Sequence, residues 1–303
     1  MIIEVCGLRR LFGQVVAVDG LTFGIERGDA VGYIGANGAG KSTTIKMLTG
    51  ILRPTAGTVR TCGLEPMRQR RRLARRIGVV FGQRSQLWWD LPLRDSYRAL
   101  GAIHRLDFRP RLAELVERLD LGDFLDTPVR QLSLGQRIRG EVAAALLHAP
   151  ELLILDEPTI GLDVLSKERL RSFLIEQRAA GTSLLLATHD MGDVRRLTDR
   201  ILVVDHGRLA FDGTLDGLAR QVGAERILVL DLAEPAPPLD FVAGTRLVGV
   251  EAGGLRQRLS FAPGTTTVAA ILAAVATAAQ LHDLTIEEPD IEAVVRRLYS
   301  LST

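Results

Sequence analysis

The chain is poor in cysteine and in long apolar runs, and its charge is nearly balanced. Its 303 residues include only two cysteines, Cys6 and Cys62, too few for a disulfide framework and without metal-ligand spacing, as expected in a reducing cytosol. The longest apolar stretch, residues 268–279, is too short to cross a bilayer. Residues 1–15 lack the apolar core of a signal peptide, so we expect a cytoplasmic location. A net charge of +2 provides no basic field, and we expect no nucleic-acid partner.

A glycine-rich run follows the apolar segment 30–34 and precedes a helix-like segment, 44–49. The run comprises Gly35, Ala36, Asn37, Gly38, Ala39, Gly40, Lys41, Ser42 and Thr43. Glycines let successive backbone N–H groups turn inward, and the following helix adds its free N–H groups and the positive end of its dipole. At this spacing Lys41 reaches the β- and γ-phosphates, and the Ser42 hydroxyl is a ligand for Mg²⁺. The sequence therefore predicts a nucleoside triphosphate site.

Two adjacent carboxylates follow the continuous apolar run 152–155, which is typical of a buried parallel strand. Asp156 and Glu157 are costly at the end of such a strand unless they meet a metal ion or a water molecule. With a phosphate loop upstream, we interpret Asp156 as the Mg²⁺ ligand and Glu157 as the general base. The alternative is a merely solvated acidic turn.

Polar residues also follow two other predicted strands. Gln83 comes just after the strand 77–81, and His189 comes just after the strand 184–187. Ligands of open α/β sheets bind beyond such carboxyl ends. Gln83 is thus a candidate to reach Mg²⁺ or the attacking water, and His189 a candidate to contact the γ-phosphate. A surface glutamine and a structural histidine remain the alternatives.

Residues 93–124 show helical spacing of apolar residues, which predicts a helical subdomain. Trp88 and Trp89 precede it, either as a contact surface for a partner or with one ring in the core. Ser133 precedes an Ala-rich helix at 142–148, and its hydroxyl suits an N-cap.

Taken in order along the chain, these segments resemble the nucleotide-binding subunit of an ATP-binding cassette (ABC) transporter over about residues 1–220. The segments that carry the resemblance are the glycine loop 35–42, Gln83, residues 132–136, the strand 152–157, residues 162–163 and His189. The resemblance implies an ATPase that binds ATP and Mg²⁺, with Phe12 stacking on adenine. It also implies that Ser133, Gly135 and Gln136 contact the ATP held by an opposite subunit. That subunit is a second copy or a paired second ABC chain.

The chain departs from the family pattern at two places. Leu134 stands where the family most often has glycine, although Ser133 and Gly135 are retained. The segment after Glu157 ends in Ile160, Gly161, Leu162 and Asp163 rather than the commoner Ser-Ala-Leu-Asp, although Asp163 is retained. The resemblance implies that two subunits communicate through this loop.

Residues 82–92 resemble a branch of the family that serves exporters with separately encoded six-helix (ABC-2-type) permeases. The resemblance implies an integral membrane permease that contacts residues 83–91. It also implies a peripheral location on the cytoplasmic face of the cell membrane. The transported substrate is not encoded here, because substrate contacts belong to the permease.

The sequence thus predicts an α/β protein with a P-loop ABC ATPase core, which has an antiparallel β subdomain and a helical subdomain, followed by a small ferredoxin-like α+β domain. We divide the chain at residue 220, with the helical subdomain at about 84–147. The elements expected after the division are strands at 227–232, 246–250, 255–261 and 281–286, helices at 266–279 and 291–299, and a proline-rich connector or poor helix at 235–242.

Two other functions compete with transport. Cassette ATPases of DNA repair carry long insertions or zinc modules between phosphate loop and signature, whereas the segment from Gly40 to Ser133 is short and has no cysteine pair. A soluble ABC ATPase of an assembly system, without a permease, is the stronger alternative. Co-purification with an integral membrane protein separates it from a transporter subunit.

Overall fold

A computed structural model describes residues 1–82, 85–105, 107–289, 292, 294–295 and 297–298. The contacts divide the chain into two compact units, Met1–Asp212 and Gly213–Thr303. None of the described helices combines the length and the apolar character that a membrane span requires.

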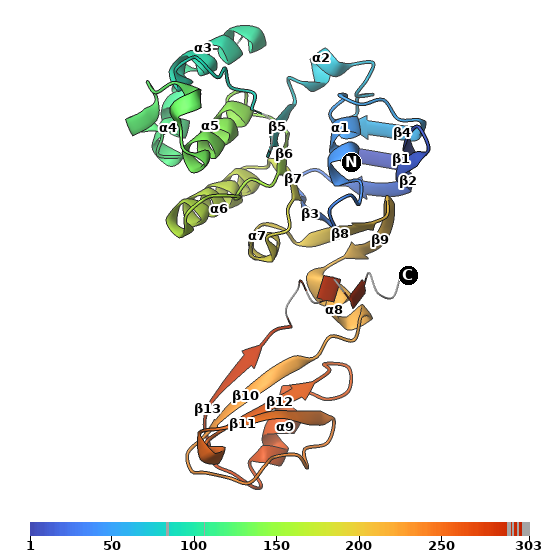
Figure 1. Ribbon diagram of the computed structural model, residues 1–303, viewed down its shortest axis with the longest axis vertical. Helices are drawn as coiled ribbons and strands as arrows, with labels where there is room; N and C mark the ends of the chain where they lie inside the picture. The colour runs from blue at the N-terminus through green and yellow to red at the C-terminus, as the bar shows by residue number, and fades with distance from the viewer. Residues whose placement is uncertain (83–84, 106, 290–291, 293, 296, 299–303) are drawn as a thin grey trace. The chain divides into compact units, whose positions relative to one another are not determined.

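The first unit is built on a six-stranded sheet in the order β5-β6-β7-β3-β8-β9 (Figure 1). Its strands are β3 (Ala30–Gly35), β5 (Ile77–Phe81), β6 (Leu152–Asp156), β7 (Ser183–Ala187), β8 (Arg200–Asp205) and β9 (Arg208–Gly213). The pairs β5–β6, β6–β7, β7–β3 and β3–β8 are parallel. Parallel pairing brings the carboxyl ends of these strands to one edge of the sheet, where the sequence places its polar groups.

Both faces of this sheet are covered, which explains why its central strands are apolar throughout. One face packs on α5 (Leu134–Leu146) and α6 (Val164–Ala179) in a core that includes Leu155. The other face packs on α1 (Lys41–Leu48) and on a second, antiparallel sheet, in a core that includes Ile154. Neighbouring residues of one strand therefore belong to different cores, as the twofold side-chain alternation of a strand requires.

The antiparallel sheet has the order β2-β1-β4. Its strands are β1 (Ile3–Phe12), β2 (Val15–Ile25) and β4 (Ala56–Thr61). Strand β2 runs without a break through Asp19 and Gly20. The turn signal at Gly20 marks an irregularity, not a break: Gly20 has φ of +73° and the register shifts between Leu8 and Arg10 opposite it.

Three helices group together in Figure 1 on one side of the six-stranded sheet: α3 (Leu93–His104), α4 (Arg109–Arg118) and α5. The helical spacing seen at 93–124 is thus confirmed. The buried Tyr97 hydroxyl of α3 donates to the carbonyl of Gly140 in α5 at 3.1 Å. Helix α5 begins at Leu134, earlier than its expected start at 142. The remaining helices of this unit are α2 (Arg70–Leu73) and α7 (Met191–Leu197).

The second unit contains α8 (Leu215–Gln221) and a four-stranded antiparallel sheet in the order β11-β12-β10-β13. Its strands are β10 (Arg226–Leu232), β11 (Thr245–Glu251), β12 (Arg256–Phe261) and β13 (Leu281–Glu287), and α9 (Val268–Val275) packs on one face. This order fits the ferredoxin-like pattern, and all four predicted strands are confirmed. Of the helix expected at 291–299, residues 292, 294, 295, 297 and 298 are described, and all five are helical.

The connector between β10 and β11 replaces the first helix of that pattern. Its prolines lack N–H donors, so residues 233–244 form no helix. The buried Gln257 holds the segment instead: its amide oxygen accepts from the Leu239 N–H at 2.9 Å, and its amide nitrogen donates to the Pro237 carbonyl at 2.9 Å. The predicted proline-rich connector is confirmed.

Candidate functional site

The glycine loop between β3 and α1 is tightly folded and borders a cavity. Gly38 and Gly40 have φ of +85° and +98°, values that favour glycine. A Cβ on Gly40 would lie 2.4 Å from the Ala17 carbonyl oxygen, and a Cβ on Gly35 would lie 2.6 Å from the Val204 carbonyl oxygen. The loop therefore requires glycine at both positions, and α1 begins directly after it, at Lys41.

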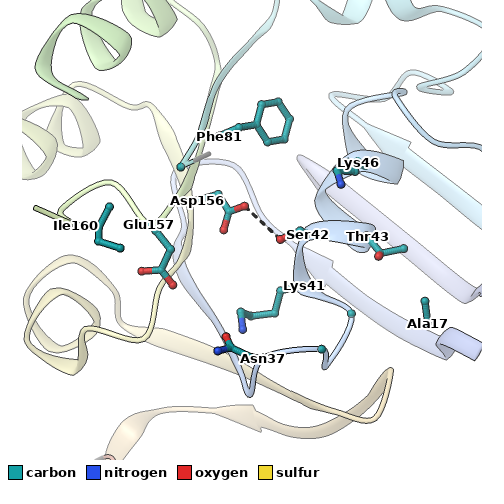
Figure 2. A pocket seen from close by; sticks show the side chains of 13 residues that line it. Ala17, Asn37, Lys41, Ser42, Thr43, Lys46, Phe81, Asp156, Glu157 and Ile160 are labelled. Atoms are coloured by element: carbon teal, nitrogen blue, oxygen red, sulfur yellow. Dashed lines mark hydrogen bonds between the residues drawn. The ribbon is translucent and has the colours of Figure 1, made fainter. Parts of the chain in front are cut away.

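Lys41 and Ser42 start α1 and point into a cavity of about 420 Å³ (Figure 2). The Lys41 ammonium donates to the carbonyls of Gly35 and Ala36 at 2.5 and 3.1 Å. Burial lowers the pKa of Lys41, and the negative charges of Glu157 and Asp156 oppose that shift. The Ser42 hydroxyl lies 3.3 Å from Asp156 Oδ2. An ammonium group and a hydroxyl group thus share one cavity with two carboxylates.

Asp156 ends β6 and faces α1 across this cavity (Figure 2). Burial raises its pKa, as does the charge of Glu157, whereas the Ser42 hydrogen bond and the charges of Lys41 and Lys46 lower it. A cation bound beside Asp156 would favour the ionised form of that carboxylate.

Glu157 has φ of +56°, and its N–H donates to the Ala187 carbonyl of β7 at 2.8 Å. Its carboxylate accepts from the Thr188 hydroxyl at 3.1 Å and from the His189 N–H at 3.2 Å. His189 Nδ1 lies 2.9 Å from Glu157 Oε1, while the rest of the ring is exposed. The carboxylate is therefore held from the neighbouring strand, with its orientation fixed.

Most residues of the predicted phosphate loop and both predicted acids gather here. The predicted residues that line the cavity are Asn37, Gly38, Gly40, Lys41, Ser42, Thr43, Asp156 and Glu157. Gly35 and the buried Ala39 form the frame of the loop behind them. Gly82 lines the cavity as well, but Gln83 lies outside the described residues.

Phe12 and His189 are not among the residues that line the cavity. Phe12 ends β1 with 47% of its surface exposed, and the Arg10 guanidinium lies 4.5 Å from its ring centroid. Ala17 of β2 lines the cavity on this side. The cation–π contact gives the phenylalanine a local partner without filling the exposed face of its ring.

The turn that starts α5, which we call the signature turn (Ser133, Leu134, Gly135 and Gln136), also lies apart from this cavity. It forms a capping box: the Gln136 N–H donates to Ser133 Oγ at 3.2 Å, and the Ser133 N–H donates to Gln136 Oε1 at 2.9 Å. Ser133 thus caps the helix as expected.

Leu134 packs against the segment that follows Glu157. A Cβ on Gly161, whose φ is +71°, would lie 2.3 Å from Leu134 Cδ2. The larger residue of the signature turn is therefore accommodated by a glycine in the facing loop. The two departures from the family pattern lie against each other.

Sequence reasoning missed two residues of the site. Lys46 lines the cavity because it lies one helical turn after Ser42 on the same face of α1. Thr188 orients Glu157 from the end of β7. The spacing of four residues and the position just past an apolar strand are the signals that identify them.

Known proteins are similar to this chain in sequence and in fold. A family model described as ABC transporter matches residues 18–160. The daunorubicin resistance ATP-binding protein DrrA3 of Streptomyces coeruleorubidus is 37% identical over 292 residues, covering 95% of this chain and 90% of that protein. The Nod factor export ATP-binding protein I of Ralstonia nicotianae is 37% identical over 261 residues, covering 84% of this chain and 79% of that protein.

A solved ATP-binding subunit of an ABC transporter is similar to this chain in fold. It matches with a TM-score of 0.69 at 30% identity, covering 74% of this chain and 94% of that structure. The predicted cassette fold is confirmed. This chain belongs to the ABC transporter family, as one of its ATP-binding and ATP-hydrolysing subunits.

Proposed function

We propose that this chain hydrolyses Mg²⁺-ATP in the cavity at the end of β3 and β6, and that two subunits close on the nucleotide to drive transport. One observation carries this proposal. Lys41 and Ser42 share one cavity with Asp156 and Glu157, which are more than a hundred residues away in the chain. A lysine, a hydroxyl and two carboxylates around one space suit a polyphosphate with its metal ion.

In this proposal the nucleotide phosphates accept hydrogen bonds from the donors of the loop. The Lys41 ammonium exchanges the carbonyls of Gly35 and Ala36 for the β- and γ-phosphates, a charge-assisted contact. Ser42 and Asp156 hold Mg²⁺ through oxygen atoms, the ligands that this ion prefers. The described residues contain no group of three or more His, Cys, Asp or Glu side chains that would hold a metal. Phosphate oxygens and water would complete the coordination.

Glu157 is the proposed general base, held by Thr188 and His189 so that it faces the attacking water. His189 is proposed to contact the γ-phosphate, since its side chain is 73% exposed and lies beside Glu157. Gln83 is proposed to reach Mg²⁺ or the water, and Phe12 to stack on adenine with its exposed face.

The signature turn is proposed to complete the nucleotide site of a second subunit. It does not line the cavity of its own chain. Leu134 of this turn is 39% exposed and lies against Gly161, and the segment that contains Gly161 also exposes Ile160, Val164 and Leu165, at 45%, 76% and 72%. A homodimer, or a pair with a second ABC subunit, would bury this surface and bring Ser133 to the partner's ATP.

ATP bound in this way contacts the closed pair more extensively than the open pair, and this difference is what performs work. A shift from 1:99 to 99:1 in favour of the closed pair needs a preference of about 5.5 kcal/mol. Several charge-assisted phosphate contacts supply energies of this order. Hydrolysis removes the γ-phosphate, and the pair reopens.

A separate membrane permease is the proposed partner, with the chain on the cytoplasmic face of the membrane. The loop at 83–91 is its proposed contact, where Trp88, Trp89 and Leu91 are 39%, 52% and 39% exposed. Export is the proposed direction, supported by the names of the relatives, one of which serves Nod factor export.

Cysteine cross-linking tests the closed pair. In a background without Cys6 and Cys62, one copy carries Asn37→Cys in its phosphate loop and the other carries Leu134→Cys. We expect a disulfide between the two only with Mg²⁺ and a slowly hydrolysed ATP analogue. Ile175→Cys, 46% exposed on α6, replaces Leu134→Cys as the matched control. A nucleotide-independent yield, equal for both pairs, would refute the arrangement.

The alternative is a soluble assembly ATPase without a permease. The exposed apolar loop at Trp88–Trp89 favours a partner but does not by itself require one in a membrane. Affinity purification from detergent-solubilised membranes decides between them, since only the transporter subunit would retain a multi-span protein.

A further inference from the structure

A buried carboxylate lies on the helix that begins at the signature turn. Glu141, in the middle of α5, is only 5% exposed. Charged residues are seldom buried to this degree unless they are paired or hydrogen-bonded. Glu141 makes no ion pair within the described residues. Its partners must therefore be hydrogen-bond donors, and the structure identifies them.

All the side-chain partners of Glu141 come from one short segment. Its Oε1 accepts from the Ser85 hydroxyl, and its Oε2 accepts from the Gln86 N–H at 3.2 Å. The Gln86 amide in turn donates to the Glu141 carbonyl at 3.1 Å. The next residue, Leu87, is buried, and its N–H donates to Ser85 Oγ at 3.1 Å. The segment 85–87 is thus fastened to α5 through both the side chain and the carbonyl of Glu141.

The same loop is fastened a second time, just before the signature turn. The Arg130 N–H donates to the Trp89 carbonyl at 3.0 Å, and the Val129 N–H donates to the Leu91 carbonyl at 3.0 Å. The Arg130 side chain also pairs with Asp90 at 3.0 Å. Residues 88–91 are therefore held between the middle of α5, through Glu141, and the turn that leads into Ser133.

Burial raises the pKa of Glu141, while the hydrogen bonds from Ser85 and Gln86 lower it. A neutral side chain at this position would avoid the cost of a buried acid. An ionised carboxylate accepts both donors of the loop at once, which an apolar residue does not. The buried carboxylate therefore holds the loop in place at a cost to the free energy of folding.

We propose that Glu141 is a positioning residue that locks the tryptophan loop (residues 85–91) to α5, so that a displacement of this loop moves the signature turn. This inference rests on the proposed function, because it assigns the loop to the permease and the turn to the partner's ATP. Glu141 contacts neither. It acts through the loop and the helix that it joins.

The two tryptophans of the chain both belong to this loop, so fluorescence excited at a wavelength that tyrosine does not absorb reports on it alone. The full-length protein is compared with Glu141→Ala, Glu141→Gln and Ser85→Ala, and with Glu114→Gln, an exposed acid of α4, as the matched control. In Glu141→Ala we expect emission at longer wavelength and at least a twofold rise in acrylamide quenching. Turnover of ATP should fall about tenfold, with ATP affinity within twofold of the original. Glu141→Gln keeps one acceptor oxygen and should restore most of both signals.

Fluorescence and turnover unchanged in folded Glu141→Ala would overturn the proposal. If that variant does not fold, Ser85→Ala decides, and unchanged quenching in it counts against the lock. A changed fluorescence with original turnover would also overturn the proposal, because the loop would then not act on the signature turn. An original chain without any ATP turnover refutes the proposed function instead, and the quenching comparison still tests the lock.

Discussion

Replacing Glu157 by glutamine should separate ATP binding from ATP hydrolysis. Glutamine has nearly the same shape, and its amide oxygen still accepts from the His189 N–H. Its amide nitrogen donates to the Thr188 hydroxyl, which also accepts from the Asp190 N–H. What the variant loses is the negative charge and the ability to take a proton from water.

The structure sets the size of each effect. One altered hydrogen bond costs about 1 kcal/mol, which for a unit of this size shifts the melting temperature by about 2–4 °C. Loss of a general base lowers turnover by about 10²–10⁴-fold, or about 3–5 kcal/mol of activation free energy. ATP affinity should not fall, because Glu157 raises the pKa of Asp156 and its charge opposes bound phosphate.

Phosphate release and size-exclusion chromatography with Mg²⁺-ATP test this prediction together. We expect the variant to accumulate as an ATP-bound dimer while it releases phosphate at least a hundredfold more slowly. Glu114→Gln, also an acid-to-amide change but at an exposed side chain of α4, is the control and should keep the original turnover. A monomeric Glu157→Gln protein with the original turnover would refute the assignment of the base.

Three further variants test the loop and the pH response. Lys41→Ala should weaken ATP binding about 10- to 100-fold by calorimetry, the loss of a charged hydrogen-bond donor, and unchanged affinity would exclude its phosphate role. Gly40→Ala should lower the free energy of unfolding by about 2–4 kcal/mol in denaturant melts, because its Cβ would meet the Ala17 carbonyl at 2.4 Å and φ is +98°. Burial, and then the charge of the neighbouring His104, lower the pKa of His148 from 6.5 to about 4, so its contribution is present above pH 6.5 and lost as the pH falls through 4. Between pH 7 and pH 4.5, His148→Gln should therefore lose about 2–3 kcal/mol less free energy of unfolding than the original protein. An equal loss in both proteins would contradict this pKa.

Functional groups that lie close together in the sequence were predictable from the sequence. Lys41 and Ser42 belong to one loop, and Asp156 and Glu157 follow one strand, so local pattern is enough to assign them. Lys46 required the geometry of a helix, since only the turn of α1 brings it to the face of Ser42. Phe12 was assigned by resemblance, and its place outside the cavity lining leaves the adenine contact a proposal.

Contacts across the chain depend on how the elements pack. The strand order β5-β6-β7-β3-β8-β9 places segments from distant parts of the sequence side by side, and no local pattern specifies such an order. Glu141 reads as one polar residue in an Ala-rich helix. Its partners, 55 and 56 residues earlier in the chain, become visible only when the loop packs on α5.

The amino-acid sequence by itself predicted the phosphate loop, the two acids and a cassette followed by a smaller α+β unit, because glycine conformations and alternating apolar runs act over a few residues. Tertiary structure alone decided which of these groups share a cavity and which side chains fasten one loop to another. The reason is physical: burial and hydrogen bonding act between neighbours in space, and the packing of distant segments makes those neighbours.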